Sequence, residues 1–221
     1  MVALVGPSGA GKTSLLRLLN GGLSADSGSV QVEGEELSRL TGSNLRRLRA
    51  RIGFIHQDHA LVPVLRVSQN VIAGKLGARG LLSGLRSVTW PKRHDLERAY
   101  ELLERVGVPH KLFDRTDTLS GGQQQRVAVA RALFQDPHAL LADEPVASVD
   151  PARGRAIIEL LVGLARERNL TLVASLHDID LARAFFPRTV GLRSGRIVYD
   201  GPTSEITGQG LQELYQLEGD G

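Results

Sequence analysis

The start of the chain leads an apolar run directly into a glycine-rich loop. Val2 to Val5 has the unbroken apolar character of a strand that is buried in a parallel sheet. The loop that follows reads Gly6-Pro7-Ser8-Gly9-Ala10-Gly11-Lys12-Thr13, which completes the pattern G-x-x-x-x-G-K-[ST]. Leucines at helical spacing come next: Leu15, Leu16, Leu18 and Leu19. A strand, a glycine-rich turn and a helix in this order constrain the chain to an α/β fold with a phosphate-binding turn.

Each part of this loop meets a different demand of a phosphate ligand. Glycines let backbone N–H groups close around the phosphate oxygens, and the start of the following helix adds a favourable dipole. Lys12 is predicted to reach the β- and γ-phosphates of a nucleoside triphosphate, and Thr13 to offer its hydroxyl to Mg²⁺. The alternative is an ordinary glycine-rich turn with a surface lysine, which the strand and helix on either side disfavour.

A second apolar run ends in two acids. Ala139 to Ala142 is expected to form a buried strand, with Asp143 and Glu144 at its carboxyl end, where α/β sheets bind ligands. Phosphoryl transfer needs a cation site beside a group that positions water. Asp143 is therefore predicted to hold Mg²⁺ through water, and Glu144 to polarise an attacking water. Taken alone, the pair could instead be the N-cap and acidic first turn of a helix.

A serine and two glycines open another predicted helix. The segment Leu119-Ser120-Gly121-Gly122-Gln123 leads into a helical stretch that we expect over Gly121 to Phe134. Such a helix start can accept an anion. Because the first loop already fills this role within one chain, the second start suggests two copies that pair head to tail around shared phosphates. The simpler alternative is a serine N-cap followed by flexible glycines.

Strands alternate with helices at both ends of the chain, whereas residues 57–134 are mostly helical. Further strands are expected at 29–32, 51–55 and 170–174, and a hairpin over 189–192 and 197–200 with Ser194-Gly195 in its turn. Further helices are expected at 67–76, 93–106, 151–167 and 204–217. Gly, Ser and Arg between residues 77 and 91 favour a surface loop. This order predicts an α/β core that carries a helical insertion.

Composition narrows the classes of function. The 221 residues are 42% hydrophobic and 23% charged, as in an ordinary globular protein. The absence of cysteine excludes disulfides and cysteine-based metal sites. A net charge of only +3 indicates no basic tail, so nucleic acid is not expected as a partner. No apolar run approaches the ~18–20 residues that span a bilayer, so any membrane role requires docking to a partner. The cluster Arg46, Arg47, Arg49 and Arg51 reads as a solvated helix face, with docking to a membrane partner as the alternative.

The motifs and their order resemble the nucleotide-binding domain of ABC transporters over nearly the whole chain. The order is the phosphate loop, Gln57, the Leu119–Gln123 segment, Asp143-Glu144, Asp150 and His177. The resemblance implies an α/β P-loop NTPase fold, with a parallel-sheet RecA-like core at 1–57 and 135–221 and an ABC-type α-helical subdomain at about 58–134. It also implies ATP hydrolysis, with ATP and Mg²⁺ bound.

The same resemblance implies roles for further residues. Ser14 joins the loop's ATP contacts, and Gln57 touches Mg²⁺ and the water. His177 acts on the γ-phosphate, and Ser148-Val149-Asp150 crosses a dimer interface, with Asp150 near ATP. The trans contact to the γ-phosphate comes from Ser120, Gly121, Gly122 and Gln123. In isolation, His177 would read as a hydrogen-bonded core histidine and Gln57 as an ordinary loop residue.

Partners and location also follow from the resemblance. It implies a homodimer of nucleotide-binding subunits, two transmembrane permease subunits and, indirectly, a periplasmic or extracellular solute-binding protein. The chain would lie peripherally on the cytoplasmic face of the bacterial plasma membrane, with residues 61–76 docked to the permease. Residues 119–126, 142–151, 175–182 and 193–201 resemble phosphonate importers, and Pro145-Val146 departs from the Pro-Thr of commoner importers. Uptake of phosphonate, a phosphate ester or another small anion is expected, with a different small solute as the alternative.

Members of the resembled family carry an N-terminal β-region with an aromatic side chain that stacks on adenine. Met1 stands in the strand before the phosphate loop, so we expect this chain to lack that region, to bind ATP more weakly and to be less stable. Three other functions are alternatives: an ABC ATPase without a membrane partner, an ATP-dependent interaction module with impaired hydrolysis, and a kinase. Asp143, Glu144 and His177 argue against the module, and the Ser120 segment has no use in a kinase.

Overall fold

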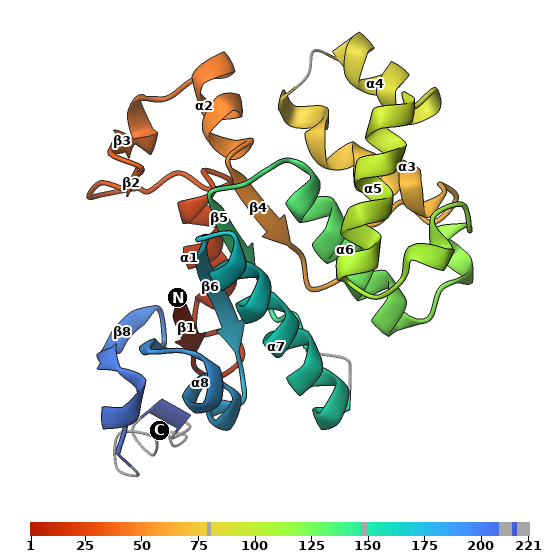
Figure 1. Ribbon diagram of the computed structural model, residues 1–221. Helices are drawn as coiled ribbons and strands as arrows, with labels where there is room; N and C mark the ends of the chain where they lie inside the picture. The colour runs from red at the N-terminus through yellow and green to blue at the C-terminus, as the bar shows by residue number, and fades with distance from the viewer. Residues whose placement is uncertain (79–80, 147–149, 208–213, 216–221) are drawn as a thin grey trace.

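A six-stranded sheet forms the core of the part of the chain that the computed structural model describes, residues 1–78, 81–146, 150–207 and 214–215. The strands lie in the order β4 (Ile52–Ile55), β5 (Ala139–Ala142), β6 (Thr171–Leu176), β1 (Val2–Val5), β7 (Arg188–Arg193) and β8 (Arg196–Pro202). All neighbours are parallel except β7 and β8, which are antiparallel. Figure 1 shows this sheet with helices packed around it. The predicted α/β fold with a mostly parallel sheet is confirmed.

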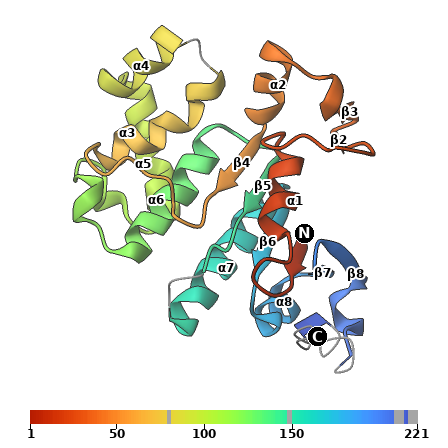
Figure 2. The same cartoon turned by 180° about the vertical axis from the view of Figure 1, so that it is seen from behind.

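The two faces of the sheet bury different helices, because successive side chains of a strand point to opposite faces. On one face, Ala3, Val5 and Leu172 pack in the same cluster as α7 (Pro151–Glu167) and α8 (Ile179–Phe185). On the other, Leu4 and Leu192 pack with α1 (Lys12–Leu19) and α2 (Gly42–Arg49). Accordingly, α7 lies in front of the sheet in Figure 1, and α1 lies in front of it in the reverse view of Figure 2.

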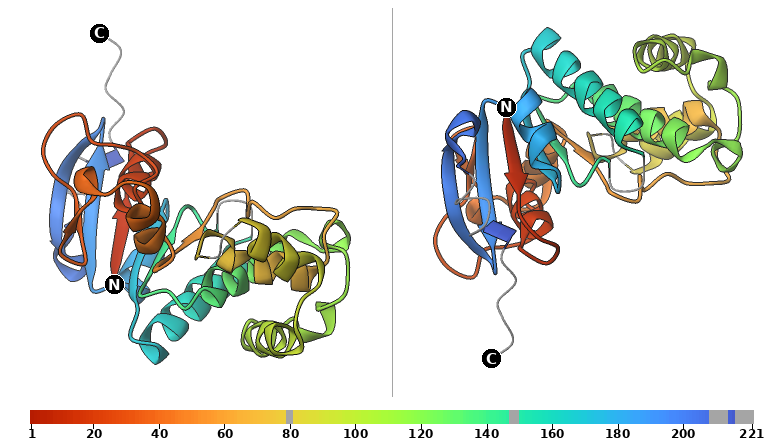
Figure 3. Two further views of the ribbon diagram at one scale, coloured as in Figure 1. Left: turned by 90° about the horizontal axis from the view of Figure 1, so that it is seen from above. Right: turned by 90° about the horizontal axis from the view of Figure 1, so that it is seen from below.

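A helical lobe extends to one side of the sheet, as the two views of Figure 3 show. It contains α3 (Val67–Ile72), η2 (Ala73–Ala78), α4 (Leu81–Thr89), α5 (Arg93–Arg105), η3 (Pro109–Lys111), η4 (Thr116–Thr118) and α6 (Gly121–Phe134). Helix α6 packs against α3 and α5 and also against β4. From Val127 to Ala130 every side chain is buried, as expected of a helix with protein on all sides. Helix α6 therefore joins the lobe to the sheet.

Several predicted elements are present with nearly the predicted bounds. Helices α6 and α7 begin and end as predicted, and α5 ends one residue earlier. The hairpin of β7 and β8 turns at Ser194 and Gly195, which have φ of 47° and 75°, the left-handed pair that a tight two-residue hairpin requires. The strand predicted at 29–32 is shorter, β2 (Gln31–Val32), and pairs with an unpredicted β3 (Glu35–Glu36).

The prediction of a surface loop over 77–91 is wrong, because α4 occupies Leu81–Thr89. Glycine and serine misled the prediction, since both usually favour loops. Here the Ser87 hydroxyl donates to the carbonyl of Gly84 at 2.7 Å, and Thr89 donates to Leu85 at 3.0 Å. Both hydroxyls thus bond within their own helix, and Val88 buries its side chain in the core.

Other boundaries also differ from the predictions. Helix α3 stops at Ile72 and continues as the 3-10 helix η2, and β6 runs to Leu176 instead of Ala174. Helices α2 and α8 and the 3-10 helix η1 (Leu37–Arg39) were not delimited from the pattern, although the exposed Arg46, Arg47 and Arg49 do lie on α2. Of the helix predicted at 204–217, residues 204–207 and 214–215 are described. Ser204 and Glu205 belong to the 3-10 helix η5 (Thr203–Glu205), and residues 206–207 are not helical, so the prediction is wrong there. The other residues of that range lie outside the described residues, as do Ser148 and Val149.

No helix in the described parts of the chain is both long enough and apolar enough to cross a membrane.

We predict that Gly74→Ala destabilises the helical lobe, whereas Gly77→Ala in the same 3-10 helix does not. A Cβ at residue 74 would lie 2.2 Å from the carbonyl oxygen of Arg131 on α6, and a Cβ at residue 77 would meet nothing within 4 Å. Overpacking of this kind costs about 1–3 kcal/mol. Urea denaturation followed by circular dichroism measures both free energies of unfolding. Equal values for the two variants would contradict the close packing of η2 on α6.

Candidate nucleotide-binding site

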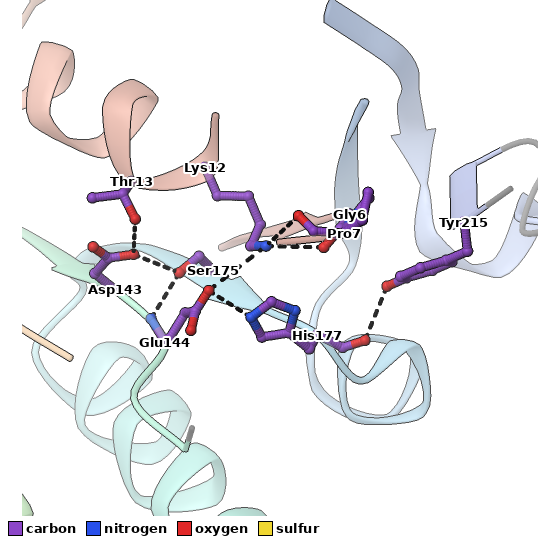
Figure 4. Close-up of polar contacts among 9 residues, drawn as sticks. All are labelled: Gly6, Pro7, Lys12, Thr13, Asp143, Glu144, Ser175, His177 and Tyr215. Carbon is purple, nitrogen blue, oxygen red and sulfur yellow. Dashed lines mark hydrogen bonds and ion pairs between the residues drawn. The ribbon is translucent and has the colours of Figure 1, made fainter. Parts of the chain in front are cut away.

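The ends of three neighbouring parallel strands bring the predicted phosphate-binding and acidic residues together. Val5 of β1 pairs with Leu176 of β6, and Ala142 of β5 pairs with Ala174 of β6. The residues that follow these strands therefore meet at one edge of the sheet. Figure 4 shows the resulting cluster, which consists of Gly6, Pro7, Lys12, Thr13, Asp143, Glu144, Ser175, His177 and Tyr215.

The loop between β1 and α1 has a backbone shape that glycine alone adopts without strain at two positions. Gly6 has a φ of 150°, and a Cβ there would lie 2.1 Å from the carbonyl oxygen of Leu192. Gly11 has a φ of 104° and is the N-cap of α1. These conformations are open to glycine and costly for other residues. The loop thus turns sharply and presents the N-terminal end of α1, with Ser8 and Gly9 exposed and Ala10 buried.

Lys12 is a buried cation at the centre of the cluster. Its side chain is 3% exposed, and its ammonium group donates to the carbonyls of Gly6 at 2.9 Å and Pro7 at 3.1 Å. Oε1 of Glu144 lies 3.7 Å away. Burial lowers the pKa of Lys12, and the nearby carboxylates of Glu144 and Asp143 only partly offset this. Because the buried ammonium is only partly compensated by these carboxylates, a bound anion such as phosphate would be stabilised beside it.

Asp143 connects three elements through one oxygen atom. Its Oδ1 accepts hydrogen bonds from the Thr13 hydroxyl at 3.0 Å and from the Ser175 hydroxyl at 3.0 Å. The backbone N–H of Glu144 in turn donates to the Ser175 hydroxyl at 2.7 Å. Asp143 and Ser175 are buried. The start of α1 and the ends of β5 and β6 are thereby locked at hydrogen-bond distance.

Glu144 stands in a strained conformation beside His177. Its φ of 44° lies in the left-handed region, which is uncommon for residues other than glycine and is often found at functional sites. The carboxylate oxygen Oε1 lies 2.5 Å from Nε2 of His177. The Tyr215 hydroxyl donates to the His177 carbonyl at 2.9 Å. Glu144 is thus held between Lys12 and His177.

The Ser120 segment begins α6 with a reciprocal pair of hydrogen bonds. The N–H of Ser120 donates to the Gln123 side chain at 3.0 Å, and the N–H of Gln123 donates to the Ser120 hydroxyl at 3.4 Å. This capping box stabilises the helix start. Ser120 and Gly121 are exposed, and a Cβ at Gly121 or Gly122 would meet nothing within 4 Å. The segment belongs to the helical lobe and lies outside the cluster of Figure 4.

Among the described residues, no hydrogen bond or ion pair joins three further predicted residues to this cluster. Gln57 is exposed two residues after β4. Asp150 caps α7 by accepting from the N–H of Arg153 at 3.0 Å, and Ser14 is exposed on α1. Direct contacts among the described residues therefore join the phosphate loop to Asp143, Glu144 and His177. Gln57, Asp150 and the Ser120 segment have no such contact with them.

The side chains present fit a nucleotide phosphate and a hard cation. The donor set for a cation consists of oxygen atoms, the Thr13 hydroxyl and the Asp143 carboxylate, which are the ligands that Mg²⁺ prefers. The buried ammonium of Lys12 and the start of α1 favour phosphate. The roles of Ser175 and Tyr215 were missed from the sequence. Ser175 directly follows the strand predicted at 170–174, and its role could have been inferred only from the register of β5 against β6.

Comparison with known proteins gives consistent matches. The family profile described as ABC transporter matches residues 1–147. The chain is 45% identical over 221 residues to the phosphonates import ATP-binding protein PhnC 1 of Rhodopseudomonas palustris (strain HaA2), covering 99% of this chain and 77% of that protein. It is 46% identical over 217 residues to PhnC of Pseudomonas fluorescens, covering 98% and 81%.

Solved structures match over similar lengths. A dimeric ATP-binding cassette in a post-hydrolysis state bound to ADP and Pi has a TM-score of 0.77 and 32% identity, covering 92% of this chain and 85% of that chain. CbiO1 from Clostridium perfringens, part of the ABC transporter complex CbiONQ, has a TM-score of 0.78 and 28% identity, covering 96% and 81%.

We predict that Ser175→Ala lowers both stability and ATP turnover. The change leaves the Glu144 N–H without its acceptor and removes one donor to Asp143, at a cost of about 1–3 kcal/mol for an unsatisfied buried group. Thr189→Ala is the matched control, because it also removes a buried hydroxyl from the central sheet: Thr189 lies on β7, and its hydroxyl bonds that of Thr203 at 2.8 Å. Urea denaturation and phosphate release measure the two effects. A turnover loss that is no larger in Ser175→Ala than in the control would argue against positioning by Ser175.

We also predict that Lys12→Met stabilises the nucleotide-free protein at pH 7 while it abolishes ATP binding. Because burial lowers the pKa of Lys12, the unfolded chain binds that proton more readily, so this group destabilises the fold below its folded pKa. The stability difference between the wild type and Lys12→Met shrinks as the pH rises toward 10.5, the ordinary pKa of a lysine. Parallel urea titrations at pH 7 and pH 9.5 test this. A variant that is less stable than the wild type at pH 7 would reject it.

Proposed function

The chain belongs to the ABC transporter family, and from that premise we propose that it is the ATP-binding and ATP-hydrolysing subunit of an import system for phosphonates or related small anions. The ATPase proposal rests on one observation: the side chains of Lys12, Thr13, Asp143 and Glu144 cluster where the parallel strands end. It combines a cation for phosphate, oxygen ligands for Mg²⁺ and a carboxylate for water.

ATP is the proposed ligand of the phosphate loop, residues Gly6 to Ser14. The backbone N–H groups at the start of α1 and the Lys12 ammonium would hold the phosphates. Thr13 and Asp143 would hold Mg²⁺, with Gln57 as a further ligand. When bound, Mg²⁺ neutralises charge on the phosphates. The hydrogen bond between Thr13 and Asp143 supports this assignment, since it holds both oxygens ready at 3.0 Å.

Glu144 is the proposed group that orients the attacking water. Its carboxylate accepts a hydrogen bond from water and turns the water oxygen toward the terminal phosphorus, while Lys12 and His177 stabilise the developing negative charge. The strained backbone of Glu144, anchored by the Ser175 hydroxyl, keeps the carboxylate from relaxing into the acidic first turn of a helix. His177 at 2.5 Å restricts the carboxylate further.

A second copy of the chain is proposed to complete each site. The Ser120 segment offers an exposed helix start in the helical lobe, and Asp150 caps α7 near the same proposed interface. In a head-to-tail dimer, Ser120, Gly121, Gly122 and Gln123 of one copy would contact the γ-phosphate bound by the other. The similarity to a dimeric cassette with ADP and Pi supports this arrangement.

The proposed division of labour follows the two regions of the fold. Residues 1–57 and 135–221 form the ATP-binding core, and about 58–134 form the helical subdomain. Residues 61–76 would dock to two transmembrane permease subunits on the cytoplasmic face of the membrane, and a solute-binding protein would act on the far side. Phosphonate as the solute rests on the names of the relatives, because the proposed role of this subunit involves no contact with the solute.

We predict that Glu144→Gln retains ATP binding and lowers turnover by at least about 100-fold, the lower range expected of a lost general base. Glu159→Gln, an exposed position on α7, is the matched control. Fluorescent-nucleotide binding and phosphate release measure the two properties. Unchanged turnover in Glu144→Gln would reject the role of Glu144.

The solute is tested with the permease and solute-binding protein of a phosphonate-importing relative, reconstituted in liposomes with this chain. We expect ATP turnover to rise when a phosphonate is added with the binding protein, and not when an amino acid replaces the phosphonate. The opposite preference would contradict the proposed solute and leave the ATPase assignment intact.

A further inference from the structure

Two residues directly after Gln57 and Asp58 share an unusual backbone conformation. His59 and Ala60 have φ of 62° and 46°, in the left-handed region, and neither is glycine. Side chains with a Cβ disfavour this region, and two such residues in succession are not held there by their own preference. In addition, Nδ1 of His59 is buried without a hydrogen-bond partner among the described residues. Within the loop, the N–H of His59 donates to the carbonyl of His56 at 3.0 Å, but the carbonyls of His59 and Ala60 are bonded from outside the loop.

Arg131, in the last turn of α6, supplies that interaction. Its guanidinium donates from Nη2 to the carbonyl of His59 at 2.8 Å and from Nη1 to the carbonyl of Ala60 at 2.5 Å. These are the two carbonyls of the left-handed pair. Burial lowers the pKa of Arg131, and the Asp58 carboxylate opposes this shift. A planar guanidinium can bond two carbonyls at once, whereas a lysine ammonium lacks this fixed fork.

The chain on both sides of the turn is anchored independently of Arg131. Before the turn, Gln57 follows β4, which is the edge strand of the six-stranded sheet. After it, Val62 exchanges hydrogen bonds with the buried side chain of Asn70 at 2.9 and 3.0 Å, and Asn70 also donates to Thr116 at 2.8 Å. In the segment between β4 and Val62, the described contacts of Arg131 are therefore confined to the turn at residues 59–60.

Arg131 itself is fixed in place. Its backbone carbonyl lies against Gly74 so closely that a Cβ there would approach to 2.2 Å. Helix α6 also begins at the Ser120 segment, which is proposed to contact a phosphate on a second copy. One helix therefore carries the Ser120 segment at its first residues and the clamp on the Gln57 loop at its last turn.

We propose that Arg131 is a positioning residue for Gln57, which it holds in place by clamping the left-handed turn at His59 and Ala60. The inference rests on the proposed function, in which Gln57 acts at Mg²⁺ and water. A displacement of the Ser120 end of α6 would move Arg131 with the helix and would shift the Gln57 loop. A change at the proposed dimer contact is thereby linked to the hydrolytic site of the same chain.

The first test compares Arg131→Lys with Arg126→Lys. Arg126 is the matched control, because it lies on the same helix and donates to the carbonyl of Val106 at 2.6 Å, away from Gln57. We expect Arg131→Lys to lower kcat about tenfold or more, since small misplacements of catalytic groups have such effects, and to speed hydrogen exchange of amides 57–61. ATP affinity should stay within about twofold. Unchanged kcat and unchanged exchange in Arg131→Lys would overturn the proposal.

A second variant leaves the arginine in place. Ala60 is exposed, so Ala60→Val does not disturb the core, but a β-branched residue resists the left-handed conformation. We expect kcat to fall in Ala60→Val and to be retained in Ala60→Gly, because glycine accepts this conformation. Equal kcat in the two variants would count against the clamped turn even if Arg131→Lys failed to fold.

A double-mutant cycle separates this inference from the proposed function. If Arg131 acts through Gln57, then Arg131→Lys lowers kcat in the wild type but causes no further loss in a Gln57→Ala background. Losses that multiply in the double variant would overturn the positioning role. A wild-type protein without ATPase activity, or a Gln57→Ala variant with full activity, would instead refute the proposed function.

Discussion

The hydrogen bonds that converge on Oδ1 of Asp143 organise the rest of the site. This atom accepts from Thr13 at the start of α1 and from Ser175 near the end of β6, while Asp143 itself follows β5. The parallel register brings these positions together, because Ala142 lies opposite Ala174. Once Asp143 and Ser175 meet, the N–H of Glu144 reaches the Ser175 hydroxyl. The carboxylate of Glu144 is then directed toward Lys12 and His177.

Much of the fold was predictable because its strands and longer helices have strong local patterns. The buried strands β1 and β5 are continuous apolar runs, and α7 begins with a capping aspartate followed by proline. The errors arose where a local preference was overridden. In α4, Ser87 and Thr89 satisfy their hydroxyls within the helix. The short helix α8 is capped by Asp178, which accepts from the N–H of Asp180 at 2.7 Å. An aspartate at this position is a helix-start signal that the sequence offers and that the prediction did not use.

The site was predictable in so far as each residue belongs to a local motif. Lys12 and Thr13 belong to the loop after one apolar strand, and Asp143 and Glu144 follow another. In the structure, Thr13 donates a hydrogen bond to Asp143, and Lys12 lies within ion-pair distance of Glu144. Ser175 and Arg131 carry no such local signal. The role of Ser175 depends on strand register, and the role of Arg131 depends on how α6 packs beside a loop more than 70 residues earlier. Gln57, Asp150 and Ser120 remain predictions, because their partners in the proposed mechanism are a ligand and a second copy.

The residues proposed to bind and hydrolyse ATP are divided between two regions of the fold. The sheet carries the phosphate loop and the acids, and the helical lobe carries Ser120 on a helix that also contacts the loop after Gln57. Neither region alone offers every group that hydrolysis needs in this account. In the proposed mechanism, each ATP also needs a second glycine-led helix start, and this start comes from another chain.

Sedimentation equilibrium of the Glu144→Gln protein with ATP and Mg²⁺ tests this requirement most directly, because blocked hydrolysis preserves the ATP-bound state. The account predicts a mass twice the 23.8 kDa of one chain, reduced to that of one chain when Ser120→Arg is added. A single-chain mass for Glu144→Gln with saturating ATP, at every protein concentration, would contradict it.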